Sequence, residues 1–164
     1  MAWIGSTVGV AADTSRRQAG ESEGPPASAE AVSDIDKLYY AGEAVAARVC
    51  GSECHQLDEV YYLRRSSAEW TRVISDMAMR GAAATPTDIE KIERFLVRFY
   101  GIVFVNSAPA DELAAVLGLT EAQAEAVVAY RTDHGPFADA DALLKVPGID
   151  PERIAEQPGA LVFE

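Results

Sequence analysis

The chain has 164 residues, of which 49% are hydrophobic and 24% are charged, and its formal net charge at pH 7 is −12. These values are typical of a soluble globular protein with a buried core, and the sequence has no run of about 18 apolar residues that could form a membrane-spanning helix. The acidic balance argues against strong binding to a phosphate backbone, which requires lysine and arginine.

The N-terminal part of the sequence divides into an apolar stretch and a polar stretch. Residues 1–12 are small and apolar and end in Val10-Ala11-Ala12, a sequence suited to cleavage, so we interpret them as the remnant of an export signal. An ordinary frayed terminus is the alternative. Residues 13–30 are rich in Gly, Pro and Ser and predict a disordered linker. We therefore expect a periplasmic or otherwise exported protein.

Residues 31–101 predict a three-helix unit. The first helix, over 31–49, leads into a loop that carries both cysteines of the chain. Ser66 and Glu69 form a capping box for the second helix, and Thr87 and Glu90 form another for the third helix, which stops near Gly101.

Residues 105–164 predict a second helical unit, which follows a short apolar run over 102–105. A helix, a short glycine turn and another helix occur at 111–130 and again at 140–156, which is an internal repeat. Gly118 is a natural end for the first helix, and Asp150 followed by Pro151 is a natural start for the last one. The predicted fold class is all-α.

The loop between the first two helices has the sequence CGSECH, residues 50–55. Covalent haem attachment ordinarily uses C-x-x-C-H, in which two thiols bind the haem vinyl groups and the histidine binds the iron. Here Cys50, Cys54 and His55 form C-x-x-x-C-H, with one extra residue that Gly51 would help to loop out. A local disulfide or free thiols are one alternative. A zinc site is another, although a fourth ligand is not evident because His134 belongs to the other unit.

Residues 40–101 resemble the small c-type cytochrome domains of quinohaemoprotein dehydrogenases. The features that carry the resemblance are the Cys/Cys-His loop, Arg64 or Arg65, the Ser-x-x-Glu-Trp segment through Trp70, Met77, Gly81-Ala82 and the closing Phe99-Tyr100-Gly101. The resemblance implies one covalent haem c, with His55 as one iron ligand and a methionine opposite, a pairing that raises the haem potential. Arg64 and Arg65 are candidates for pairing with haem propionates, although adjacent arginines are more often simply solvated.

Two methionines on one predicted helix compete for the position opposite His55. Met77 and Met79 are two residues apart, which separates them by about 200° of rotation, so they cannot both face one pocket. Met77 shares its stripe with Trp70 and Ile74, whereas Met79 has polar neighbours. The spacing therefore favours Met77 as the ligand, and a core methionine is the alternative interpretation.

Residues 105–164 resemble the tandem helix-hairpin-helix domain of exported competence proteins. The matching features are the asparagine-led turn, the Leu-Gly-Leu hairpin, the Ala-Tyr-Arg end of a helix, the His-Gly-Pro-Phe link and the Leu-Leu-Lys-Val-Pro-Gly-Ile hairpin. DNA-binding members have Gly-hydrophobic-Gly hairpins that hold a phosphate at a helix N-terminus. In this chain Thr120 and Asp150 replace the second glycines, and residues 108–164 contain eleven acidic and three basic side chains. DNA binding is therefore disfavoured.

We therefore predict a cytochrome c-like helical domain over 31–101 followed by a helix-hairpin-helix domain over 105–164. The predicted function is electron transfer to a redox partner protein by an exported haem c protein, with the second domain used to dock a partner or to stabilise the cytochrome. No catalytic apparatus is recognisable, so we do not expect an enzyme. The alternative is a non-haem helix-hairpin-helix protein of DNA uptake or secretion.

Overall fold

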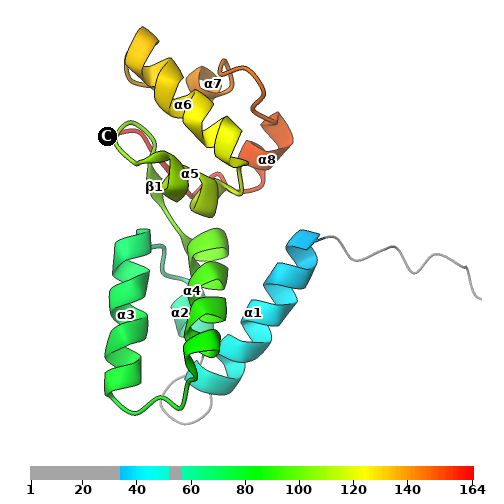
Figure 1. The fold of residues 1–164 in the computed structure, drawn as a ribbon, viewed down its shortest axis with the longest axis vertical. Coiled ribbons are helices and arrows are strands. Elements are labelled where there is room, and N and C mark those ends of the chain that lie inside the picture. The colour runs from blue at the N-terminus through cyan, green and yellow to red at the C-terminus, as the bar shows by residue number, and fades with distance from the viewer. Residues whose placement is uncertain (1–33, 52–56) are drawn as a thin grey trace, which may run out of the picture. The chain divides into compact units, whose positions relative to one another are not determined.

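The computed structural model describes residues 34–51 and 57–164 (Figure 1). The predicted export-signal remnant (1–12), the predicted linker (13–30), Cys54 and His55 lie outside the described residues. The described residues belong to one compact body, residues 32–164, whose helix-hairpin-helix part over 105–164 is its C-terminal unit.

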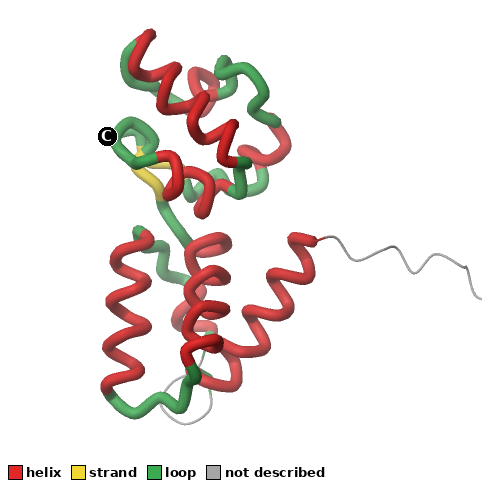
Figure 2. The backbone as a smooth tube through the Cα atoms, in the orientation of Figure 1, coloured by secondary structure: helices red, strands yellow, loops and turns green. Residues whose placement is uncertain are grey.

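The fold is all-α, as predicted, because helices form nearly all of its regular structure (Figure 2). The elements in chain order are α1 (Asp34–Cys50), α2 (Asp58–Tyr61), α3 (Ser67–Met79), α4 (Pro86–Tyr100), β1 (Val103–Phe104), α5 (Ala110–Leu117), α6 (Glu121–His134), α7 (Ala140–Leu143), α8 (Pro151–Ala155) and β2 (Leu161–Val162). None of the helices in the described ranges has the length and apolar character needed to span a bilayer.

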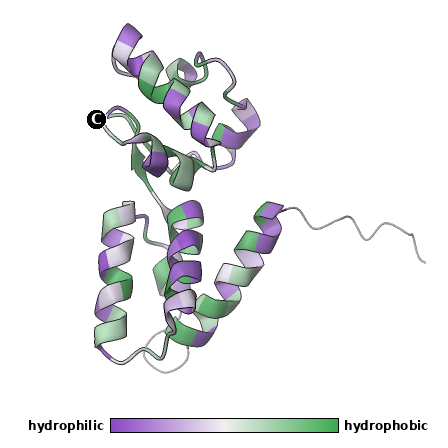
Figure 3. Cartoon of the chain, in the orientation of Figure 1, coloured by the Kyte–Doolittle hydropathy of each residue, from purple (hydrophilic) through white to green (hydrophobic). Residues whose placement is uncertain are grey.

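Helix α4 is the element against which the others are organised, because it contacts α1, α3 and α5. Its buried side chains include Ile92 and Phe95, which are 1% and 0% exposed, and they join Trp70 of α3 in the hydrophobic core. Figure 3 shows that α3 and α4 each carry both apolar and polar residues, as expected for helices with one buried face.

The helix starts follow local capping chemistry. The Ser66 hydroxyl accepts a hydrogen bond from the Glu69 N–H and the Glu69 carboxylate accepts one from the Ser66 N–H, which confirms the predicted capping box of α3. The predicted box of Thr87 and Glu90 is wrong. The box of α4 is formed by Thr85 and Asp88, because Pro86 takes the first helical position, where its missing N–H costs nothing.

The C-terminal unit is closed by a strand pair that sequence analysis described only as an apolar run. Strands β1 and β2 are parallel, with Val103 opposite Leu161 and Phe104 opposite Val162. Helix α7 is shorter than expected, since it ends at Leu143 and tight turns follow it up to Gly148.

Close packing between α1 and α4 depends on Gly42. A Cβ atom at this position would lie 2.3 Å from the Phe95 Cβ, which is in the core and has no free space to move into. We expect Gly42→Ala to lower the free energy of unfolding by about 1–3 kcal/mol through overpacking, despite the higher helix propensity of alanine. Urea denaturation would measure the change. Ala44→Ser, at an exposed position of α1, is the control and should change stability by less than about 0.5 kcal/mol.

Candidate functional site

A small apolar cavity lies where the end of α1 meets α3 and α4. Its volume is about 80 Å³, and its wall includes the thiol of Cys50 and the thioether of Met77. All the other lining side chains are apolar or aromatic: Val49, Val60, Trp70, Val73, Ile74, Ala78, Ala82, Ala84, Ile89, Ile92 and Leu96. Two sulfur groups that lie 27 positions apart in the chain (77 − 50) therefore line the same apolar cavity.

Met77 reaches this cavity because of its position on α3. The capping box fixes the start of the helix, and Trp70 and Ile74 on the same face are 1% and 8% exposed. Met77 is one turn further on and half-buried, whereas Met79 points to solvent and is 78% exposed. The apolar stripe thus correctly placed Met77 on the buried face of α3 and Met79 on the exposed face. The role of Met77 as an iron ligand stays a prediction.

Cys50 is the last residue of α1 and is half-buried. Burial raises the pKa of its thiol above the usual value, because the thiolate is poorly solvated there. The N–H of Gly51 donates to the Ala47 carbonyl at 3.1 Å, so the backbone keeps helical bonding up to the start of the segment that carries Cys54 and His55. Within the described ranges, no three His, Cys, Asp or Glu side chains form a metal-binding group.

Arg64 and Arg65, the candidates for haem propionate contacts, both contact other parts of the protein. The guanidinium of Arg65 lies 5.8 Å from the centre of the Trp70 ring, and the backbone of Arg65 bonds to Tyr100 and Ile102. Arg64 is exposed and donates to the Gly101 carbonyl at 3.3 Å. These contacts join the start of α3 to the end of α4.

An aromatic cluster beside the cavity was missed by sequence analysis. The rings of Tyr61 and Tyr100 stack at 4.7 Å, and Tyr39 and Phe95 make edge contacts with each other. The Tyr61 hydroxyl is buried without a hydrogen-bond partner among the described residues, and burial together with the nearby Glu43 raises its pKa to about 12. The only sequence signal was a high density of aromatic residues around 39, 61 and 95–100, with no periodicity that connects the three segments.

The two hairpins of the C-terminal unit keep one glycine each in the left-handed region. Gly118 has φ +66° and Gly148 has φ +85°. Thr120 caps α6, and its hydroxyl accepts a bond from the Gln123 N–H. The side chain of Gln123 in turn donates to the Gly148 carbonyl at 2.7 Å, which ties the two hairpins together.

Asp150 occupies the helix end at which a phosphate would bind. Its carboxylate accepts a hydrogen bond from the Glu152 N–H at 3.0 Å and caps α8. A negative group therefore already satisfies this N-terminus, and it would repel a phosphate.

Asn106 is the structural centre of the C-terminal unit. Its amide donates to the carbonyls of Phe137 and Phe163 at 2.9 and 3.0 Å, and its side-chain oxygen accepts from the Phe137 N–H at 2.8 Å. One side chain therefore links the turn after β1, the segment after α6 and the segment after β2.

We expect Asn106→Ala to lower the free energy of unfolding by about 2–4 kcal/mol, because three partly buried backbone groups lose their partners. Chemical denaturation measures this loss. Thr132→Ala is the control, since that hydroxyl bonds only to the preceding turn of its own helix and is exposed. A loss for Asn106→Ala no larger than for the control would contradict this role.

Comparison with known proteins identifies the C-terminal unit. The family model of the helix-hairpin-helix motif matches residues 100–161. A curated protein from Bos taurus, "Endonuclease/exonuclease/phosphatase family domain-containing protein 1", is 42% identical over 48 residues, which are 29% of this chain and 8% of that protein. No solved structure matches the chain significantly. The prediction of a helix-hairpin-helix motif is therefore confirmed, and the matched segment starts at Tyr100, slightly before the predicted boundary. The resemblance to exported competence proteins stays a prediction.

Proposed function

We propose that this protein is an exported electron carrier that binds one haem c, and that its helix-hairpin-helix unit docks a partner protein. The observation that carries the proposal is the apolar cavity lined by both Cys50 and Met77. Cys50 is also the first residue of the C-x-x-x-C-H sequence. Cys50 and Cys54 would hold the haem, and His55 and Met77 would bind its iron.

The residues that line the cavity fit a haem in their chemistry. The Met77 thioether is a suitable iron ligand, the Cys50 thiol can add to a haem vinyl group, and an apolar lining limits the access of water, which raises the reduction potential of an iron site. A cavity of about 80 Å³ is too small to enclose a porphyrin and covers only part of one. The segment 52–56, which carries Cys54 and His55, follows directly on Cys50 and lies outside the described residues.

Each side chain has a distinct role in this proposal. The haem would supply a one-electron couple, and Met77 would give its iron a neutral, soft ligand that favours the reduced state. Trp70 and Ile74 would keep water away from that ligand. Trp70 is itself fixed, because its indole N–H donates to the Tyr100 carbonyl at 3.0 Å.

Protein docking fits the C-terminal unit better than DNA binding. Residues 108–164 carry a net charge of −8, from three basic and eleven acidic residues (3 − 11), and the Asp150 carboxylate caps α8. An acidic surface of this kind steers basic patches of a partner and opposes a polyanion. The alternative is a non-haem protein of DNA uptake or secretion, which the helix-hairpin-helix match also allows.

The test is to produce the full chain in a host that exports and matures c-type cytochromes. We expect a coloured protein, a positive haem peroxidase stain after denaturing electrophoresis, and loss of the covalent haem in Cys50→Ala and Cys54→Ala. Met79→Ala should keep its colour. A colourless, iron-free product would overturn the haem proposal, and binding of duplex DNA that weakens steeply with salt would support the alternative.

A further inference from the structure

A second and larger cavity lies away from the sulfur-containing one. It is a cleft of about 940 Å³ lined by residues of α1, α3, α4, α5 and α8, together with the hairpin residue Gly118. It shares no lining residue with the cavity of Cys50 and Met77. Any ligand of this cleft is therefore independent of the haem proposal.

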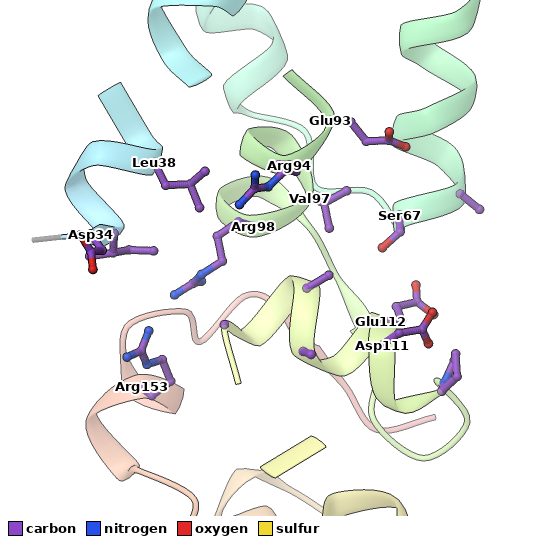
Figure 4. A pocket seen from close by; sticks show the side chains of 16 residues that line it. Asp34, Leu38, Ser67, Glu93, Arg94, Val97, Arg98, Asp111, Glu112 and Arg153 are labelled. Atoms are coloured by element: carbon purple, nitrogen blue, oxygen red, sulfur yellow. The ribbon is translucent and has the colours of Figure 1, made fainter. Parts of the chain in front are cut away.

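Three arginines line one end of the cleft. Figure 4 shows Arg98 of α4 and Arg153 of α8 directed into the same space, with Arg94 one helical turn before Arg98. Neither Arg94 nor Arg153 has an ion-pair partner among the described residues. Three positive groups thus converge on one space in a strongly acidic protein.

Arg98 is a buried cation that its neighbours do not fully neutralise. Its side chain is 5% exposed, while its nearest carboxylate, Glu156, is 3.9 Å away and 58% exposed. One guanidinium nitrogen donates to the Val116 carbonyl at 3.3 Å, and the Nε has no partner. Burial lowers the pKa of Arg98, and the positive charge of Arg153 lowers it further, against the opposite effect of Glu156. A buried charge in this state is costly unless an anion accompanies it.

The opposite end of the cleft has the opposite charge. Glu93 of α4 and Asp111 and Glu112 of α5 line it, as Figure 4 shows. Asp34 lies at the arginine end, and its carboxylate is paired with Lys37 at 2.8 Å and almost fully exposed. A long polyanion would meet the acidic end, so the cleft suits an anion small enough to stay near the arginines.

We propose that the arginine end of this cleft binds a compact oxyanion, a carboxylate or a phosphate, between Arg98 and Arg153. The planar guanidinium groups present paired N–H donors that match the two oxygens of such an anion. The bound anion would neutralise Arg98 and connect α4 to α8.

Calorimetric titration of the full chain tests the proposal at constant ionic strength, with inorganic phosphate in one arm, succinate in another and chloride as the reference. We expect saturable binding of one phosphate or succinate per chain. Arg153→Gln should weaken it at least tenfold, and Arg94→Gln should weaken it less. Lys145→Gln makes the same charge change at an exposed residue outside the cleft, and should change the affinity less than twofold.

Comparison of phosphate with succinate shows whether the site prefers a phosphate or a carboxylate, and binding of either anion supports the proposed site. Arg98→Gln would remove the central cation, but it also removes a structural contact, so Arg153→Gln decides the test. Absence of saturable binding for both anions, or equal weakening in Lys145→Gln and Arg153→Gln, overturns the proposal. Competition by a short DNA duplex for the same site would also overturn it, because the ligand would then be a polyanion.

Discussion

Replacing Met77 by alanine in the haem-loaded chain is expected to lower the reduction potential by on the order of a hundred millivolts, because the iron would lose its thioether ligand. The same change removes a half-buried apolar side chain from the cavity wall, so the free energy of unfolding of the haem-free chain should fall by about 2 kcal/mol. Potentiometric titration followed by absorption measures the first effect, and urea denaturation measures the second.

Met79→Ala is the matched control on the same helix. Met79 is 78% exposed and lies outside the cavity, so neither the potential nor the stability should change appreciably. A stability loss in Met77→Ala without a change in potential would assign Met77 to the core alone. A change in potential in Met79→Ala would instead mean that the ligand was assigned to the wrong residue.

Gly118→Ala is expected to lower the free energy of unfolding by about 3 kcal/mol, much more than the equivalent change at Gly148. Both glycines have positive φ, which costs an alanine about 1–2 kcal/mol. At Gly118 the added Cβ would also lie 2.7 Å from the Nε of buried Arg98, which adds about 1–2 kcal/mol of overpacking. At Gly148 no atom lies within 4 Å, so backbone strain alone remains.

A double-mutant cycle with Arg98→Ala separates the two costs. The strain at Gly118 is independent of Arg98, but the clash requires it, so the two losses should be less than additive by about 1–2 kcal/mol. Equal losses at Gly118 and Gly148 would show that the α5 hairpin and Arg98 are not tightly packed. Urea denaturation gives the free energy of unfolding of the parent chain and of four variants: Gly118→Ala, Gly148→Ala, Arg98→Ala and the double variant of Gly118 and Arg98.

Local signals predicted most of the helices correctly. The Ser66 capping box, the glycine end of α5 and the Asp150-Pro151 start of α8 depend on residues within four positions of one another. The apolar stripe of α3 correctly separated Met77 from Met79 for the same reason. The error at α4 was also local, since Pro86 moved the cap from Thr87 to Thr85.

Features that depend on distant contacts could not be predicted from the sequence. The sequence predicts that Arg98 is an ordinary exposed basic residue on an amphipathic helix. The packing of α4 against α5 buries it instead. Likewise, Tyr61 meets Tyr100 only once α2 lies beside the end of α4. No rule of spacing along one helix links such pairs, because the loops between the elements decide which faces meet.

The pairing of β1 with β2 has a consequence for how the chain folds. Val103 pairs with Leu161, and the Gln157 side chain donates a hydrogen bond to the Arg98 carbonyl at 2.6 Å, so both contacts join residues that are far apart in the sequence. Contacts of such long sequence separation form late. Without the segment around β2, the N–H groups of Val103 and Val105 lack their partners, the carbonyls of Ala160 and Val162. The region between these two strands is therefore expected to close late in folding.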